Sequence, residues 1–376
     1  MKNDIDHTIM LSASYAKSLL NFLKKLIERL IELNKNVVVV APNIENNLRL
    51  KLENMGCIVT SVSLRRNKID VLSDIIYFVQ IYLLLRKYKP ALLLSYTSKP
   101  NIYGAFAAYL ANVRSISIIT GLGINFSQHQ KIFSCSIFKI LFKKALSLNS
   151  FVICQNNDDI KELQFNGFLR NLDKVGLVNG SGVDVQFFDE RSLPETTRFL
   201  MVARLLKSKG IFEYLEAAKS TVMKGYDVTF TLIGPNDYGP DAVDRNYIEQ
   251  KYAEYVTILD EVEDVRPIIE NSSVLVLPSY REGTPRSFLE AMAMGRAIVT
   301  TDVPGCRETV IDAENGFLVK EKSVDSLVDA LTLLCENPKF IPMMGKRSRT
   351  IVEKKYEVNF VTDQYVNHIM QNLELY

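Results

Sequence analysis

Several signals that would assign a chain to a common class are missing from these 376 residues. The five cysteines form no C-x-x-C pair and are odd in number, so we expect reduced thiols that pack in the interior. No apolar run is long enough to cross a bilayer, and residues 1–7 lack the apolar core of a signal peptide. We therefore expect a protein that is neither secreted nor membrane-spanning.

The chain also lacks two motifs that would mark a ligand site near its start. No Gly-x-Gly-x-x-Gly follows the first expected strand, Thr8–Leu11, which argues against a dinucleotide site there. Asp4 and Asp6 form a carboxylate pair of a kind that binds metal ions, but they precede that strand. We read them as part of a solvated tail, and we expect no metal site and no cofactor.

The order of the apolar segments predicts an α/β protein. The chain is longer than one comfortable core, which favours two domains. Buried-strand patterns alternate with helical stretches through the first half and restart with Arg198–Ala203. A glycine-rich segment, 178–185, and a change of charge after it place the domain boundary between residues 186 and 187.

Charge divides the chain at the same point. Residues 1–186 hold 23 Lys and Arg against 13 Asp and Glu, a net charge of +10, whereas residues 187–376 hold 22 against 30, a net charge of −8. A basic domain with interleaved apolar residues suits an anionic membrane surface. Nucleic acid is the competing partner, but the sequence has neither a recognition-helix nor an RNA-binding signature, so we expect none.

One stretch, Tyr280–Gly295, has the features of a ligand site. It follows a buried strand, Val274–Leu277, and opens a helix for which Thr284 is the expected N-cap, Pro285 the first residue and Gly295 the C′ residue. A strand that feeds a helix N-terminus in a doubly wound sheet favours anions. Because a carboxylate repels phosphate, Glu282 at this place indicates hydroxyl groups, as on a sugar attached to the phosphate.

Glu282 and Glu290, with seven residues between them, resemble the E-x7-E signature of retaining GT-B glycosyltransferases of the large family-four group. The similarity spans most of the chain. It implies two Rossmann-like, doubly wound domains that face a cleft, residues 1–186 and 187–355, and a C-terminal helix, residues 356–376, that crosses back to the first domain. The residues alone also allow an ordinary Arg286–Glu290 pair on a helix surface.

The resemblance implies a role for each matching residue of the second half. Glu282, Arg204 and Lys209 would be catalytic, because the family's first Glu contacts the donor sugar and its Arg and Lys bind the donor diphosphate. Glu290 would contact the ribose of the nucleotide. Gly283, Thr284 and Val262 would complete the donor site, although Asp260 stands where relatives usually have glycine.

Three loops of the first half follow expected strands, where a doubly wound domain meets its ligand. The loops 96–104 and 120–126 resemble a subgroup that extends sugars on undecaprenyl diphosphate. That resemblance assigns Ser14, Lys99 and Asn101 to the acceptor and Gly121 and Gly123 to the donor. Without the resemblance, Lys99 is equally well explained as a solvated surface residue. The two glycines are then explained as part of an ordinary turn. Many relatives carry a histidine where this chain has Thr120 and Gly121, and His129 has no spacing that marks a catalyst.

Residues 131–148 mix aromatic and aliphatic side chains with lysines. This composition suits a helix that lies in a membrane interface, and it equally suits a core helix with a lysine-rich solvent face. With the basic first domain, it leads us to expect a cytoplasmic protein that binds peripherally to the inner face of the cell membrane.

The activity implied by the resemblance is retaining, metal-independent transfer of a hexose or N-acetylhexosamine from a nucleotide sugar, a UDP-sugar, to a lipid-linked saccharide in bacterial polysaccharide or glycan assembly. Two alternatives remain from the residues. One is a nucleotide-sugar epimerase, which needs no acceptor, and the other is a non-catalytic scaffold that binds nucleotide sugar.

Overall fold

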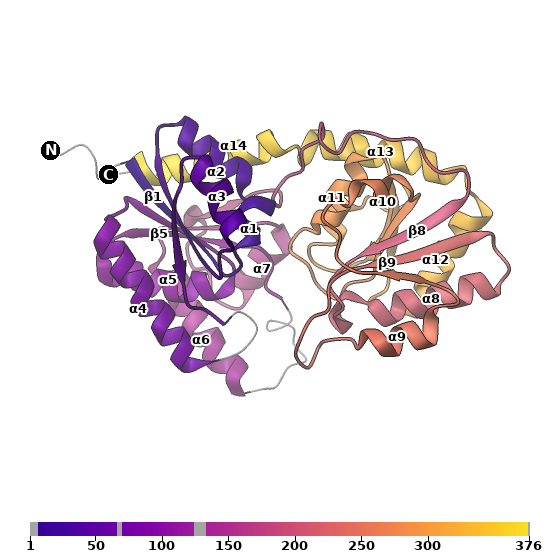
Figure 1. Cartoon of the computed structure of the whole chain (residues 1–376), viewed down its shortest axis with the longest axis horizontal. Helices are drawn as coiled ribbons and strands as arrows, with labels where there is room; N and C mark the ends of the chain where they lie inside the picture. Colours follow the sequence, from indigo (N-terminus) through magenta and orange to yellow (C-terminus); the bar gives the residue numbers. More distant parts are fainter. Residues whose placement is uncertain (1–6, 66–69, 124–132, 375–376) are drawn as a thin grey trace. The chain divides into compact units, whose positions relative to one another are not determined.

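The structure is a computed structural model that describes residues 7–65, 70–123 and 133–374 (Figure 1). The chain divides into two compact units, residues 1–181 with 359–376, and residues 182–358. The division lies close to the predicted positions, residues 186/187 and 355/356. Asp4, Asp6 and His129 lie outside the described residues, as do the start of the expected helix 131–148 and residues 124–126 of the third loop.

Unit 1 is built on a seven-stranded parallel sheet with the order β3-β2-β1-β4-β5-β6-β7. The strands are β1 (Thr8–Ala13), β2 (Asn36–Pro42), β3 (Ile58–Val62), β4 (Leu92–Tyr96), β5 (Arg114–Ile119), β6 (Phe151–Cys154) and β7 (Val175–Leu177). The helices are α1 (Lys17–Asn21), α2 (Lys24–Glu32), α3 (Asn46–Asn54), α4 (Val71–Tyr88), α5 (Ser98–Ala111), α6 (Phe133–Leu148), α7 (Asn157–Phe165) and α14 (Val358–Glu374).

Both faces of this sheet are covered, which explains why its strands are continuously apolar. Along β1, Ile9 and Leu11 belong to the core under α2 and α14, whereas Met10 belongs to the core under α4 and α5. The last helix, α14, packs Val361 and Ile369 into the first of these cores. The C-terminal segment is therefore part of unit 1.

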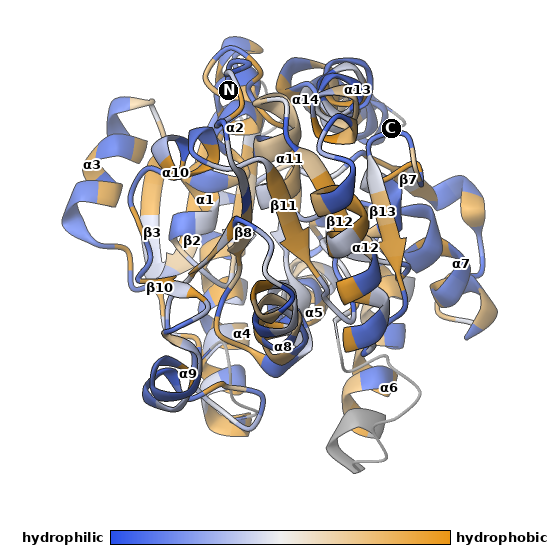
Figure 2. Ribbon diagram, turned by 90° about the vertical axis from the view of Figure 1, so that its right-hand side faces the viewer, coloured by the Kyte–Doolittle hydropathy of each residue, from blue (hydrophilic) through white to orange (hydrophobic). Residues whose placement is uncertain are grey.

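Unit 2 is built on a six-stranded parallel sheet with the order β10-β9-β8-β11-β12-β13. The strands are β8 (Thr197–Val202), β9 (Val228–Ile233), β10 (Thr257–Leu259), β11 (Val274–Leu277), β12 (Ala297–Thr301) and β13 (Gly316–Val319). The helices are α8 (Ile211–Met223), α9 (Arg245–Tyr252), α10 (Arg266–Glu270), α11 (Arg286–Ala293), α12 (Val324–Glu336) and α13 (Phe340–Lys355). Figure 2 shows the central strand β11 in hydrophobic colours along its length, and all four of its residues are buried.

The predicted fold class, two Rossmann-like parallel-sheet domains, is confirmed. Two local expectations are wrong. The segment expected as a loop, residues 96–104, is helical from Ser98 onward, because Pro100 lies in the first turn of α5, where its missing N–H is no loss. Thr284 does not cap α11, since Pro285, with ψ 114°, takes the N-cap position and the helix begins at Arg286.

Candidate active site

Four loops of unit 2 meet at the carboxyl edge of its sheet, after β8, β9, β11 and β12. Backbone hydrogen bonds tie them together: the Tyr280 amide donates to the Ser208 carbonyl (2.9 Å), and the Glu282 amide donates to the Pro304 carbonyl (3.2 Å). The Lys207 amide donates to the Asp241 carbonyl of the loop after β9 (2.8 Å). Parallel sheets bind ligands at this edge, and in unit 2 the loops that form it are hydrogen-bonded to one another.

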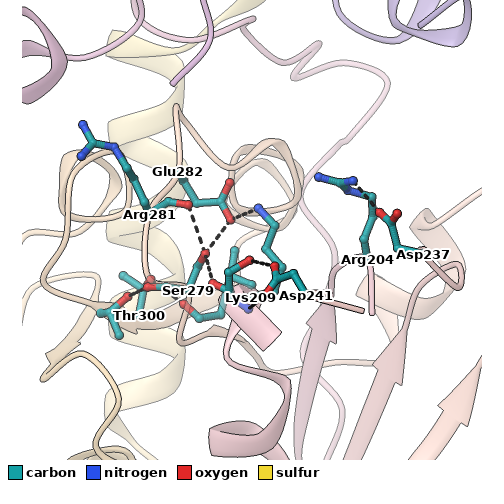
Figure 3. A network of polar contacts seen from close by, with 11 residues as sticks. Arg204, Lys209, Asp237, Asp241, Ser279, Arg281, Glu282 and Thr300 are labelled. Atoms are coloured by element: carbon teal, nitrogen blue, oxygen red, sulfur yellow. Dashed lines mark hydrogen bonds and ion pairs between the residues drawn. The ribbon is translucent and has the colours of Figure 1, made fainter. Parts of the chain in front are cut away.

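Lys209 and Glu282 form the centre of this surface. The Lys209 ammonium donates to Glu282 Oε1, and the Ser279 hydroxyl donates to the same oxygen from 2.9 Å. Figure 3 shows the ammonium and the carboxylate pointing toward each other, whereas Arg281 points away from Glu282. The two side chains are only 18% and 14% exposed. The pair is thus largely screened from water yet reachable from the edge, as a ligand-binding charge pair must be.

Arg204 follows the end of β8 in the same loop as Lys209. Its guanidinium donates to Asp237 Oδ2 at 2.6 Å, and the two residues face each other in Figure 3. Asp237 is 9% exposed, whereas Arg204 is 41% exposed. The carboxylate therefore positions a guanidinium that still presents donors to solvent or to an anion.

Glu290 projects from α11 and pairs with Arg286, whose Nε lies 2.8 Å from Glu290 Oε1. The helix-surface pair is therefore present, but Glu290 is only 14% exposed. Burial raises the pKa of Glu290 above its ordinary value, and the nearby Arg286 guanidinium opposes that rise. A buried carboxylate of this kind is stabilised by further hydrogen-bond donors, such as the hydroxyls of a ligand.

The remaining donor-site candidates of unit 2 lie on irregular segments. Gly283 and Thr284 belong to the loop between β11 and α11. Val262, after β10, is half-buried and packs against the core of the unit. Asp260, at the predicted glycine position, is 82% exposed and pairs with Arg245 at 3.0 Å. Its carboxylate therefore points to a neighbouring helix.

Comparisons with known proteins match both units to described families. Residues 196–337 match the family "Glycosyl transferases group 1", and residues 11–156 match "Glycosyl transferase 4-like". The chain belongs to the GT-B glycosyltransferases. The predicted resemblance is thereby confirmed.

Two relatives and two solved structures illustrate the match. The chain is 26% identical over 375 residues to an N,N'-diacetylbacillosaminyl-diphospho-undecaprenol alpha-1,3-N-acetylgalactosaminyltransferase of Campylobacter jejuni, covering 93% of this chain and 94% of that protein. It is 26% identical to a UDP-Gal:alpha-D-GlcNAc-diphosphoundecaprenol alpha-1,3-galactosyltransferase of Escherichia coli, covering 80% and 82%. It shares the fold of a sucrose-phosphate synthase of Thermosynechococcus elongatus (TM-score 0.81, 17% identity, 97% and 98% covered). It also shares the fold of Anabaena HepE in complex with UDP-glucose (TM-score 0.76, 16% identity, 97% and 99% covered).

The three acceptor candidates of this glycosyltransferase lie at the carboxyl edge of unit 1, where each side chain is already bound to another residue of the protein. Ser14 is buried and accepts a hydrogen bond from the Thr97 hydroxyl at 2.7 Å. Lys99 is held by Asp74 at 2.6 Å, and both side chains are nearly buried. Asn101 is buried in α5, where its amide donates to the Ile118 carbonyl at 2.9 Å. Lys99 and Asn101 therefore already have protein partners, and their acceptor roles stay predictions.

Gly121 and Gly123 lie after β5 at the same edge of unit 1. Both have positive φ, 108° and 64°, and an added Cβ at Gly123 would meet no atom within 4 Å. Backbone conformation thus favours glycine at both positions, and at Gly123 no crowding within the described residues adds to it. Their predicted contact with the donor stays a prediction.

Sequence reasoning missed the carboxylates that organise the edge of unit 2. Residues 237–244 carry no motif that marks a ligand site, yet Asp237 holds Arg204 and Asp241 accepts from the amide and hydroxyl of Ser208. Ser279, which donates to Glu282, was missed as well. The available signal was position, since the segments containing these residues follow the strands β9 and β11 of a parallel sheet.

Replacing Gly305 with alanine is expected to disturb the Glu282 loop. An added Cβ would lie 2.3 Å from the carbonyl oxygens of Glu282 and Gly283, and φ is 81°. We expect a loss of ~1–3 kcal/mol in unfolding free energy and a clear drop in transfer rate. Gly225→Ala is the matched control, because its φ is 86° but its Cβ would meet no atom within 4 Å. Denaturant titration measures the unfolding free energy of both variants. Equal losses in Gly305→Ala and Gly225→Ala would contradict the steric explanation.

Proposed function

We propose that this glycosyltransferase moves a hexose or N-acetylhexosamine from a UDP-sugar, with retention of configuration, to a saccharide linked to undecaprenyl diphosphate. The observation that carries the proposal is the Lys209–Glu282 pair at the carboxyl edge of unit 2. The acceptor class is supported by the Campylobacter jejuni and Escherichia coli relatives, both of which are named for action on diphospho-undecaprenol substrates. The product would enter bacterial surface polysaccharide or glycan assembly.

Arg204 and Lys209 supply positive charge where the donor diphosphate would leave. Arginine presents a fork of donors to phosphate oxygens and lysine a compact charge, so both stabilise the negative charge that grows as the glycosidic bond breaks. In this proposal they take the part that a metal ion plays in other transferases. Asp237 fixes the position of Arg204 through its 2.6 Å contact.

Glu282 and Glu290 would bind hydroxyl groups. Glu282 Oε1 already accepts from Lys209 and Ser279, an arrangement that suits a positioned acceptor of sugar hydroxyls better than a free nucleophile. Retention then follows from attack on the face from which the diphosphate departs. Glu290 would accept from the ribose, which also provides donors for its buried carboxylate.

The function is tested by supplying purified protein with a panel of UDP-sugars and N-acetylglucosaminyl-diphospho-undecaprenol. Transfer that needs both substrates, with an α-linked product from an α-linked donor by NMR, is the expected result. A new sugar formed without the lipid would instead identify an epimerase. Nucleotide binding without transfer to any lipid-linked saccharide would identify a scaffold. We expect transfer to continue in the presence of EDTA. If EDTA abolishes transfer and added magnesium restores it, the reaction depends on a metal ion and this part of the proposal is wrong.

We further propose that unit 1 rests on an anionic membrane surface through α4, α5 and α6. These helices pack side by side, and α4 exposes an apolar stripe formed by Val71, Leu72, Ile75, Ile76, Val79 and Leu83. A groove of about 530 Å³ between the three helices is lined by Phe78, Phe106, Tyr109, Leu110, Leu141, Lys144 and Leu148. Within the described residues, no helix is long and apolar enough to cross a membrane.

The charge around this face favours anionic lipid as its occupant. Arg86 and Lys87 lie in the last turn of α4, and Lys143 and Lys144 lie on α6. Each basic residue near an anionic surface contributes ~1 kcal/mol of binding. The face would place the enzyme on the inner leaflet, where a lipid-linked acceptor is presented.

The double variant Ile75→Asp/Val79→Asp is expected to lose binding to phosphatidylglycerol vesicles by at least about tenfold. Two exposed apolar side chains, 54% and 43% accessible, would be replaced by charges that the membrane repels. Transfer to a water-soluble short-chain acceptor should remain unchanged. The control is Leu50→Asp on α3, equally apolar and 58% exposed. Co-sedimentation measures binding, and an equal loss in the control would contradict a membrane role for α4.

A further inference from the structure

Unit 1 contains a second cavity that the proposed transfer reaction does not use. It has a volume of about 610 Å³ and lies between the C-terminal half of α6, residues 167–171 and the starts of β6 and β7. We call it the α6–β7 pocket; α6 is labelled in Figure 1 and β7 in Figure 2. Its size is within the range of pockets that bind small molecules.

The pocket lies at the edge of the sheet opposite to the acceptor candidates. Asn149 directly precedes β6 and Lys174 directly precedes β7, so both mark the amino ends of strands. Ser14, Lys99 and Gly121 follow the carboxyl ends of β1, β4 and β5. Because all strands of this sheet are parallel, the pocket is distinct from the acceptor edge.

Four cations converge on the pocket, and no carboxylate lines it. Lys143 and Lys144 come from α6, Arg170 from the loop after α7, and Lys174 from the turn before β7. Among the ion pairs of the described residues, none includes any of these four side chains. The two lysines of α6 do not lie in its last turn, and Arg170 and Lys174 lie outside that helix, so the helix dipole does not account for the four cations. Unpaired cations around a cavity favour a ligand with more than one negative charge.

The pocket also offers an acceptor and an apolar wall. Asn149 lines it and is 6% exposed; its amide nitrogen donates to Ser117 Oγ (2.9 Å) and to the Ala145 carbonyl (3.0 Å). Its Oδ1 is buried without a hydrogen-bond partner in the described part of the chain. Phe168, with Lys143 Nζ 5.9 Å from its ring centroid, contributes aromatic surface. A hydroxyl of a ligand would satisfy Oδ1, and a carbon face would pack on the ring.

We propose that the α6–β7 pocket binds a phosphate ester that carries hydroxyl groups. The cations recognise the phosphate, Asn149 a hydroxyl and Phe168 the apolar face. Two molecules present this chemistry: a soluble sugar phosphate and the glycerophosphate headgroup of an anionic lipid. Lys144 lines both this pocket and the apolar groove of α4, α5 and α6, so a headgroup in the pocket would lie next to the proposed membrane face.

The test uses the full chain with a double charge reversal, Arg170→Glu/Lys174→Glu. Both side chains are exposed, so folding should be retained, which circular dichroism and thermal melting verify. The matched control is Lys51→Glu/Lys161→Glu, an equal change of net charge at exposed positions of unit 1 that do not line the pocket. The variant Lys209→Ala reports any phosphate bound at the donor edge of unit 2.

Two probes separate the two sources. Glucose 1-phosphate is titrated calorimetrically, and phosphatidylglycerol vesicles are titrated by co-sedimentation. We expect the pocket variant to weaken binding of at least one probe by about tenfold or more, as loss of charge-assisted hydrogen bonds predicts, while the control binds within about twofold of the parent. Any loss of glucose 1-phosphate binding in Lys209→Ala measures the share that binds at the donor edge instead. Loss confined to glucose 1-phosphate identifies a soluble ligand, and loss confined to vesicles identifies a headgroup.

The proposal is overturned if neither probe binds, if the pocket variant binds both probes like the parent, or if the control loses as much as the pocket variant. It is also overturned if Lys209→Ala abolishes glucose 1-phosphate binding and vesicle binding is unaffected by the pocket variant, because the phosphate site would then be the donor edge. None of these measurements uses sugar transfer. Failure here therefore leaves the transferase proposal standing, and loss of transfer leaves the pocket unaffected.

Discussion

Replacing Glu282 with alanine is expected to lower kcat by at least about a hundredfold while the chain remains folded. The carboxylate is fixed by Lys209 and Ser279 at the sheet edge, so it can contact the transferred sugar without reorganising. Loss of one preorganised contact of this kind costs about 10²–10³ in rate in enzymes that stabilise charge in the transition state. Initial rates at saturating donor and acceptor measure kcat, and titration of the donor gives KM separately.

Two further variants separate catalysis from folding. Glu282→Gln keeps an oxygen for the Ser279 hydroxyl but removes the charge that pairs with Lys209, so kcat should fall while thermal stability changes less than in the alanine variant. Glu263→Ala removes an exposed carboxylate from the same unit and should act like the parent enzyme. Near-normal turnover in both Glu282 variants would exclude this residue from the mechanism.

The apolar patterns were sufficient to predict most of the fold. The strand 274–277 begins and ends where the sequence places it, and the strands 151–154 and 316–319 and the helix 211–223 coincide with apolar patterns of the sequence. Each has a continuous or periodic apolar pattern bounded by polar or turn-forming residues. Residues 19–33 have one unbroken helical period of apolar residues, but they form two helices, α1 and α2, which meet at Phe22 and Leu23. The hydrophobic period continues through that junction, so the pattern cannot reveal it.

The loop expected over residues 96–104 is wrong because the glycine that indicated it has a packing role. Gly104 indicated a loop, yet it lies inside α5, where an added Cβ would be 2.5 Å from Ser95 Oγ on the underlying strand. The glycine is present because helix and sheet approach closely, not because the chain turns. Single-sequence patterns carry no information on this distance.

The site was predictable to the extent that its residues follow strands. Lys209 and Glu282 are 73 positions apart, and the expectation that they act together came from the family resemblance; both follow strands of one sheet, β8 and β11. The partner of Lys99, by contrast, is Asp74 on α4, a helix residue that no strand end marks. Pairing between the first turn of α5 and the side of α4 depends on how the helices pack over the sheet, which the sequence pattern leaves open.

The variant Lys209→Ala should also lose at least about a hundredfold in kcat, because the ammonium would face the diphosphate as the glycosidic bond breaks. Its control is two residues away: Lys207 lies on the same short 3-10 helix, is exposed and is directed to the Pro240 carbonyl at 3.4 Å. Lys207→Ala should retain nearly full activity. Loss of the same size in both variants would point to damage of the helix start rather than to a role of the ammonium.

Combining Lys209→Ala with Glu282→Ala gives the sharpest test of the pair. Residues in direct contact that act on one bound sugar are not additive, so the double variant should be no more than about tenfold slower than the slower single variant. Removing both partners also avoids leaving one buried charge unpaired, and the double variant should be at least as stable as Glu282→Ala. Fully multiplicative losses, about ten-thousandfold together, would show that the two side chains act on separate steps and would contradict a shared donor site.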